Sequence, residues 1–196
     1  MPAVLYMSMG YPDARGVKWV SALRDAGLSV VVLRGRCPRT LGTIWLDSID
    51  GVEIETMEQL CSKLPLQRAV AKGVHDRIAA WRPDAIIVRD VFLAGYALSA
   101  AERCKVPCYV DVADNYPEVI RSIVRPEFVG HLGSGLLNQW ERHMLRRAAG
   151  TIVVSPESKL HIMRKHGLPG SRIRIVENVP RRPDTHPSSA VVFSGR

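Results

Sequence analysis

Carboxylate side chains cluster in one short stretch of the sequence, DVADNYPE, which covers residues 111–118. It holds Asp111, Asp114 and Glu118, and Tyr116 lies between the last two. Carboxylates accept hydrogen bonds from sugar hydroxyl groups, and two that lie close together shift each other's proton affinity, so that one can act as a base. The stretch therefore indicates a site for a polyol substrate. The structural alternative is that Asp114 caps a turn and Asp111 pairs with a donor in the core.

Two other stretches carry residues that suit a polar or anionic ligand. Arg89 and Asp90 directly follow the apolar run AIIV, where they either face a ligand or form an internal ion pair. Gly10, Asp13 and Gly16 follow the first apolar run, in the stretch MGYPDARG. A glycine-containing loop before a helix can present backbone N–H groups to an anion. The glycines do not form the GxGxxG fingerprint of dinucleotide binding, and an ordinary turn is the alternative.

The sequence lacks the patterns of several enzyme classes. It contains no GxSxG, HExxH or P-loop pattern and no Cys–His nucleophile pattern, which argues against hydrolases and phosphate-loop NTPases. Four cysteines are too few for a disulfide scaffold in 196 residues, so free thiols and a cytoplasmic location are expected. No metal is expected either, because four of the histidines do not converge at metal-ligand spacing: His131, His143, His161 and His166.

Apolar runs alternate with helical patterns along the chain, and unbroken runs such as SVVVL at 29–33 are typical of strands buried on both faces. The alternation predicts an α/β fold, a Rossmann-like, doubly wound and mostly parallel sheet flanked by helices. The glycine-rich stretch at 130–135 is expected to be a flexible loop. Strands are expected at 3–8, 29–33, 85–88, 108–112, 151–154 and 173–176, with two short ones within 43–57, and helices at 17–26, 66–81, 93–103, 136–148 and 157–166.

In such a sheet, ligands bind beyond the carboxyl ends of the strands, which is where the candidate residues fall.

Changes in composition along the chain indicate how it is divided into domains. Residues 1–180 form the Rossmann-like domain, and 181–189, rich in Pro and Ser, form a linker. Residues 190–196 begin with a fresh apolar run, which we expect to be the first strand of a second domain that this chain lacks.

Positive charge is concentrated in one third of the chain. Residues 1–120 carry 14 basic and 14 acidic side chains, whereas 121–182 carry 12 basic and 4 acidic ones, a difference of +8. Such a cluster attracts phosphates or an anionic membrane surface. The expected helix at 136–148 has a basic face with Arg142, His143 and Arg146 that either contacts a membrane or is simply solvated. Nucleic acid is not an expected partner, since no basic run is interleaved with aromatic residues.

The order of these stretches resembles the N-terminal half of retaining family-four glycosyltransferases, which have the two-domain GT-B fold. RDAGLSVVVL resembles the family's helix, glycine and second strand, and RPDAIIVRD and KVPCYVDVADNYPE resemble its central strands. ERHMLRRAAGTIVVSPES resembles the stretch in which a helix that begins with Glu leads into a strand ending in Ser. SRIRIVENVP and AVVFSGR resemble the segments on either side of the interdomain linker.

The resemblance implies transfer of a sugar from a nucleotide-sugar to a polysaccharide or lipid-linked acceptor, with no obligatory metal, at the inner membrane face. It implies that the opening loop approaches the donor diphosphate and that Arg196 is a donor-phosphate ligand. Ala113 stands where the family commonly has His, so Asp114 with Tyr116 is the expected catalytic position. The acceptor-binding residues implied are Arg89, Asp90, Asp111, Tyr116 and Glu118, and the donor-loop residues are Gly10, Asp13 and Gly16.

Because most donor contacts of the family belong to the C-terminal domain, this chain alone is expected to be inactive. Two alternatives stay open. A nucleotide-sugar 2-epimerase shares the two-domain architecture, but it is expected to need no acceptor and no membrane. A non-catalytic module that binds a sugar or phosphate predicts that residues 190–196 dock onto the sheet of this domain.

Overall fold

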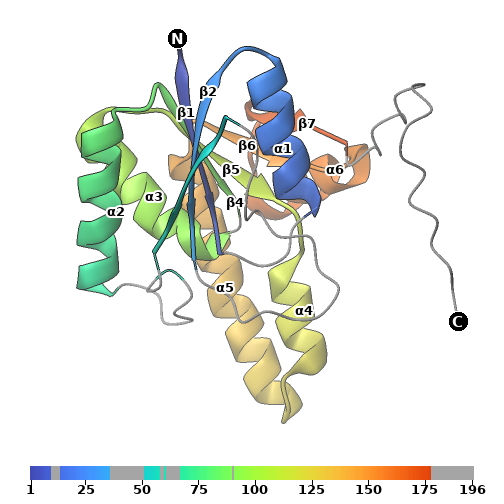
Figure 1. The fold of residues 1–196 in the computed structure, drawn as a ribbon. Coiled ribbons are helices and arrows are strands. Elements are labelled where there is room, and N and C mark those ends of the chain that lie inside the picture. Colours follow the sequence, from blue (N-terminus) through green and yellow to red (C-terminus); the bar gives the residue numbers. More distant parts are fainter. Residues whose placement is uncertain (10–13, 36–50, 58–59, 61–66, 90, 178–196) are drawn as a thin grey trace, which may run out of the picture.

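The computed structural model describes residues 1–9, 14–35, 51–57, 60, 67–89 and 91–177. Within them, seven strands form one sheet in the order β3-β2-β1-β4-β5-β6-β7, and every neighbouring pair is parallel (Figure 1). The order reverses between β1 and β4, as in doubly wound sheets, so the predicted fold class is confirmed. The strands are β1 (Ala3–Ser8), β2 (Ser29–Arg34), β3 (Glu53–Thr56), β4 (Ala85–Arg89), β5 (Cys108–Val112), β6 (Gly150–Val153) and β7 (Ile173–Ile175).

Helices cover both faces of the sheet (Figure 1). On one face, side chains of α2, α3, α5 and α6 join the inward side chains of β4, β5 and β6 in one buried cluster. On the other face, Val20 of α1 packs in a second cluster with Val32 and Ile87. The helices of these two layers are α1 (Ala14–Asp25), α2 (Arg68–Trp81), α3 (Val91–Cys104), α5 (Glu127–Arg147) and α6 (Pro156–His166).

The register of the central strands places the candidate loops side by side. Arg89 at the end of β4 lies beside Asp111 of β5, and Val112 lies beside Val153 at the end of β6. Because parallel strands end at the same edge, the segments that leave β5 and β6 are neighbours. This edge is where the sequence predicted the site to lie.

Between β5 and β6 the chain forms a helical hairpin of α4 (Tyr116–Ile123) and α5 that extends beyond the edge of the sheet (Figure 1). The expectation of a loop at 130–135 was wrong, because these residues lie inside α5. Glycine disfavours a helix by about 1 kcal/mol relative to alanine, but packing can outweigh that cost. At Gly130 a Cβ would lie 3.1 Å from the Val124 carbonyl oxygen, so glycine lets the two helices approach closely.

The other element boundaries differ from expectation by a few residues. Of the stretch 43–57, the described part contains β3, and residues 36–50 lie outside the described residues. A short 3-10 helix (Gly170–Arg172) precedes β7. No helix in the described part of the chain has both the length and the apolar character needed to cross a membrane. The predicted linker at 181–189 and the strand at 190–196 also lie outside the described residues, so this domain division stays a prediction.

Candidate functional site

A pocket of about 260 Å³ lies at the carboxyl ends of β5 and β6, between the start of α4 and the first turns of α6. Its apolar floor is formed by Val112, Val153 and Ile162. Complete small-molecule sites usually enclose roughly 300–1,000 Å³, so the pocket has the size of part of such a site. Polar side chains line the rest of it: Asp114, Asn115, Glu141, Glu157, Ser158 and His161.

The sequence SPES positions the α6 side of this pocket. Ser155 is the N-cap of α6, and its Oγ accepts a hydrogen bond of 3.1 Å from the backbone N–H of Ser158. Pro156 fits the first turn because its missing N–H has no partner to lose there. At the other end, Gly167 adopts a left-handed φ of 66° and ends the helix. Consequently Ser158 and His161 project from a helix whose start is fixed at the end of β6.

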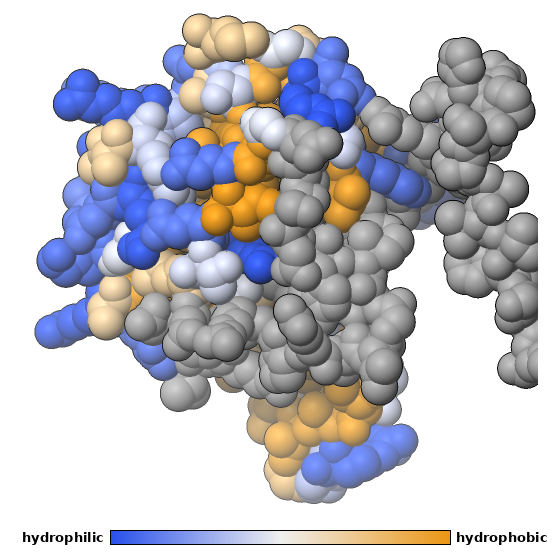
Figure 2. All heavy atoms as spheres, viewed as in Figure 1, coloured by the Kyte–Doolittle hydropathy of each residue, from blue (hydrophilic) through white to orange (hydrophobic). Residues whose placement is uncertain are grey.

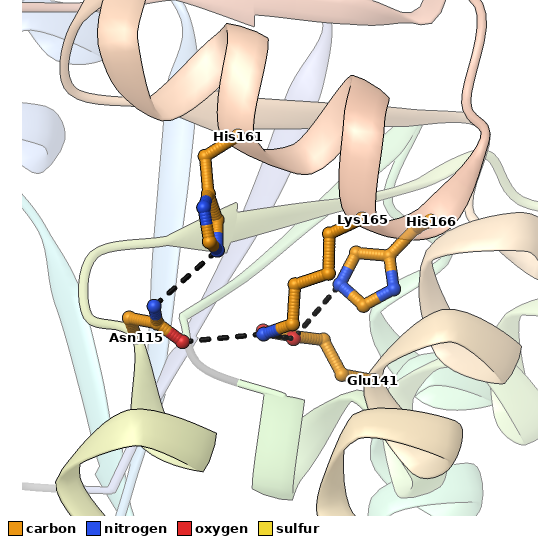
Figure 3. Close-up of polar contacts among 5 residues, drawn as sticks. All are labelled: Asn115, Glu141, His161, Lys165 and His166. Carbon is orange, nitrogen blue, oxygen red and sulfur yellow. Dashed lines mark hydrogen bonds and ion pairs between the residues drawn. The ribbon is translucent and has the colours of Figure 1, made fainter.

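A network of polar side chains along the pocket is centred on the buried carboxylate of Glu141, which is 1% exposed (Figure 3). Glu141 Oε2 lies 2.9 Å from His166 Nε2 and accepts a hydrogen bond of 3.1 Å from Lys165 Nζ. Lys165 also donates to Asn115 Oδ1 at 3.2 Å. The Asn115 amide nitrogen lies 3.3 Å from His161 Nε2. The network therefore joins α5 to α6 and holds Asn115 and His161 at the pocket.

The environment of Glu141 favours its ionised form. Burial by itself raises the pKa of this carboxyl group, but the hydrogen bond from His166 and the charge of Lys165 outweigh burial, so the net pKa lies below its ordinary value. A carboxylate whose pKa is lower in the folded than in the unfolded state stabilises the fold. This contribution is present above the unfolded pKa of about 4.3 and is lost as the pH falls through the lower folded value.

Replacing Glu141 with Gln is expected to lower the free energy of unfolding at pH 7 by about 2 kcal/mol, the scale of a hydrogen bond to a charged group. The difference from wild type is fully present above the unfolded pKa of about 4.3 and shrinks as the pH falls through the lower folded pKa, where the native carboxylate takes up its proton. Urea unfolding across this pH range measures it. Glu102→Gln is the matched control, because Glu102 pairs with Arg147 at 2.7 Å but is 54% exposed. A difference that persists unchanged at pH 3 would contradict the assigned charge state.

On the opposite face of the sheet, Arg15 of α1 and Asp111 of β5 form a buried, two-pronged ion pair. Arg15 Nη2 lies 2.7 Å from Asp111 Oδ1, and Arg15 Nε donates to Oδ2 at 2.9 Å. The side chains are 6% and 0% exposed. Arg15 Nη1 also donates to the carbonyl oxygen of Val176, after β7, at 3.1 Å. This arginine therefore joins α1, β5 and the segment that follows β7.

A comparison with protein families identifies the domain to which these elements belong. A model of the glycosyl transferase 4-like domain matches residues 15–179. The chain belongs to this glycosyltransferase family. The match extends from the start of α1 past β7, and so includes every element that forms the pocket and the ion pair. A comparison with curated protein sequences gave no significant match.

Solved structures similar to this glycosyltransferase domain share its fold. Sucrose-phosphate synthase from Thermosynechococcus elongatus superposes with a TM-score of 0.66 at 12% identity, over 90% of this chain and 48% of that one. MurG from Acinetobacter baumannii superposes with a TM-score of 0.57 at 15% identity, over 93% of this chain and 47% of that one. UDP-GlcNAc 2-epimerase from Methanocaldococcus jannaschii superposes with a TM-score of 0.54 at 10% identity, over 90% of this chain and 45% of that one. The chain thus spans about half the length of these proteins, and its fold is that of an N-terminal GT-B domain.

The structure separates the two aspartates that the sequence grouped together. Asp114 is exposed and lines the pocket on the α5–α6 side. Asp111 points to the α1 side, where Arg15 engages both of its oxygens. This arrangement corresponds to the structural alternative, pairing with a donor in the core. It favours a positioning role for Asp111, while its role in acceptor binding stays a prediction.

The remaining predicted residues lie around the same edge or outside the described part. Tyr116 begins α4, and its ring meets that of Phe92 edge to face with centroids 4.9 Å apart. Glu118 is exposed and pairs with Arg121 at 3.7 Å. Arg89 is half-buried at the end of β4, and Gly16 is buried in α1. Four predicted residues lie outside the described residues: Gly10, Asp13, Asp90 and Arg196.

Sequence reasoning missed Asn115, Glu141 and Lys165. The signal available for Glu141 was its position on the buried side of an amphipathic helix, one turn before Leu145, where an acidic residue needs a partner. Among the described residues, no group of three His, Cys, Asp or Glu side chains is placed to hold a metal ion. That the reaction needs no metal remains a prediction.

Proposed function

We propose that this domain is the acceptor-binding half of a glycosyltransferase that moves a hexosyl group from a nucleotide-sugar to a polysaccharide or lipid-linked acceptor, with retention of configuration. The observation that carries the proposal is the pocket at the carboxyl ends of β5 and β6 in a chain of this family. Asp114 lines the pocket and is exposed, so its carboxylate can accept a hydrogen bond from an acceptor hydroxyl group.

In this proposal, the donor is bound mainly by a C-terminal domain. The acceptor oxygen bonds to the anomeric carbon on the same face from which the nucleotide diphosphate leaves, so the bond to the diphosphate breaks with retention of configuration. Asp114 orients the hydroxyl group that reacts and takes up its proton. His161 and Asn115 contribute hydrogen-bonding groups beside Asp114, and the small volume of the pocket fits a site that the donor domain completes. Gly10, Asp13, Gly16 and Arg196 are proposed to approach the donor diphosphate.

Calorimetric titration of the 196-residue chain with UDP- and GDP-sugars tests whether the donor is bound mainly by the second domain. Weak or absent binding is expected, because the donor site needs the second domain, and the full-length protein is the positive control. Tight stoichiometric binding by this chain would contradict the proposal. Turnover of a nucleotide-sugar by the full-length protein without any acceptor would instead identify the epimerase alternative.

We further propose that the full-length enzyme acts at the inner surface of the cytoplasmic membrane. The concentration of positive charge supports this location, because residues 121–182 carry 12 basic against 4 acidic side chains. Each basic residue near an anionic bilayer contributes about 1 kcal/mol to binding at moderate ionic strength. An acceptor linked to a membrane lipid is then available where the domain binds.

A further inference from the structure

The large exposed apolar side chains of the described residues gather on the α4–α5 hairpin. Six of the ten such side chains lie there and are between 41% and 70% exposed. Figure 2 shows apolar surface at the protruding end of the molecule. Exposed apolar groups that lie singly need no explanation, but a contiguous group marks an interaction surface. We call this group the hairpin patch: Val119, Ile123, Phe128, Val129, Leu132 and Leu136.

Along α5, the hairpin patch continues into basic residues on the same side of the helix. Nine of the eleven exposed residues of α5 recur at helical spacing, so they form one stripe along its length, and the other two, Glu127 and Val129, lie in its first turn. Apart from His131, the first half of the stripe is apolar, and the second half carries Arg142 and Arg146, with about 9 Å between Leu136 and Arg142 at 1.5 Å per residue. No acidic residue lies in it. The stripe consists of Phe128, His131, Leu132, Gly135, Leu136, Gln139, Arg142, His143 and Arg146.

The charged residues near the tip of the hairpin neutralise each other. Arg121 lies 3.7 Å from Glu118, and Arg125 lies 3.4 Å from Glu127. The tip therefore offers no excess negative charge that would oppose contact with anionic lipid. Arginine side chains can also keep their charged ends in water while their stems lie against apolar surface.

We propose that the α4–α5 hairpin is the element that docks this protein on an anionic bilayer, with the hairpin patch in the acyl-chain boundary and Arg142 and Arg146 at the headgroups. The inference rests on the proposed membrane location. A bilayer suits the surface because the hairpin is convex and offers apolar side chains for the acyl-chain boundary and, further along α5, positive charge for anionic headgroups. A peptide ligand would instead need a groove.

The hairpin also connects the bilayer to the pocket. Asn115 lines the pocket and directly precedes α4, whose eight residues span about 12 Å. With the end of α4 at the acyl-chain boundary, the pocket lies at the height of a headgroup and its first attached groups. The geometry therefore points to an acceptor that is linked to a lipid through a polar headgroup, rather than to a free soluble sugar.

Co-sedimentation with vesicles tests the docking surface. The wild-type chain is expected to bind vesicles of phosphatidylcholine that contain anionic phosphatidylglycerol, and to bind pure phosphatidylcholine vesicles more weakly. The triple variant Ile123→Ser, Leu132→Ser, Leu136→Ser is expected to bind at least tenfold less. Arg142→Ser with Arg146→Ser is expected to weaken the preference for anionic over neutral vesicles. Leu160→Ser, which removes an exposed leucine from α6, is the matched control and binds as wild type.

The outcomes separate this inference from the proposed membrane location. If the wild-type chain and the full-length protein both fail to bind vesicles, the location and the docking surface are both wrong. If wild type binds and the triple variant binds equally, the hairpin inference alone is overturned. It is also overturned if sedimentation velocity shows a dimer that the triple variant dissolves, or if the full-length protein binds far less than this chain because its own second domain covers the patch. Circular dichroism confirms that each variant is folded.

Discussion

Asp114→Asn is expected to lower sugar transfer by the full-length enzyme by about 10²–10⁴-fold, the range that a positioned acid or base contributes. Asp114 follows β5 directly and is exposed at the pocket, so its carboxylate is available to an acceptor hydroxyl group. An amide of the same shape keeps one hydrogen-bond acceptor but loses the negative charge and the capacity to take up a proton. The expected loss is in kcat, with a smaller change in KM for the acceptor.

The melting temperature distinguishes this role from a structural one. Exposed substitutions usually change the free energy of unfolding by less than about 0.5 kcal/mol, so the variant is expected to melt within a few degrees of wild type. Asp76→Asn is the matched control, because Asp76 is a half-exposed aspartate on α2 and lies outside the pocket. Unchanged transfer would remove Asp114 from the proposed mechanism, and a large fall in melting temperature would show that it caps the turn instead.

Most strands of this fold could be predicted because they are short runs of apolar residues bounded by Gly, Pro or polar residues, whereas the edge strand β3 has the sequence EIET and gives no such signal. The order of the runs also placed Asp114 at the carboxyl end of β5, where the pocket lies. The segment after it was harder to predict. DNYPE has the composition of a loop, yet α4 starts at Tyr116 because Pro117 fits a first helical turn and the new helix packs on α5.

The polar network at the pocket could not be predicted, because its members are distant in the sequence. Glu141 and His166 are 25 residues apart, and the rotation of α5 relative to α6 decides whether they meet. The periodicity of apolar residues shows which side of a helix is buried, but it does not show which residue of another helix a buried side chain will contact. Likewise, Arg15 lies in the stretch MGYPDARG, which the sequence predicted as a glycine-containing loop, and nothing in the sequence pairs it with Asp111, 96 residues away.

Arg15→Ala is expected to lower the free energy of unfolding by about 3–5 kcal/mol, because it leaves the carboxylate of Asp111 buried without its partner. Two parallel hydrogen bonds of 2.7 and 2.9 Å hold the pair, and Asp111 is fully buried. Urea unfolding measures the loss. Lys72→Ala is the control, since the Lys72–Asp76 pair is equally short at 2.7 Å but exposed, and exposed ion pairs contribute little to stability.

Replacing both members of the buried pair decides what Asp111 is for. The double variant Arg15→Met, Asp111→Leu removes both charges and fills the space with apolar groups, so it is expected to recover most of the stability that Arg15→Ala loses. The Val176 carbonyl, which accepts a hydrogen bond from Arg15, still loses its donor at a cost of about 1 kcal/mol. If the stable double variant in the full-length enzyme keeps its affinity for acceptor, Asp111 acts only through the fold. If the protein is stable but acceptor affinity falls, Asp111 contributes to the acceptor site as the sequence predicted.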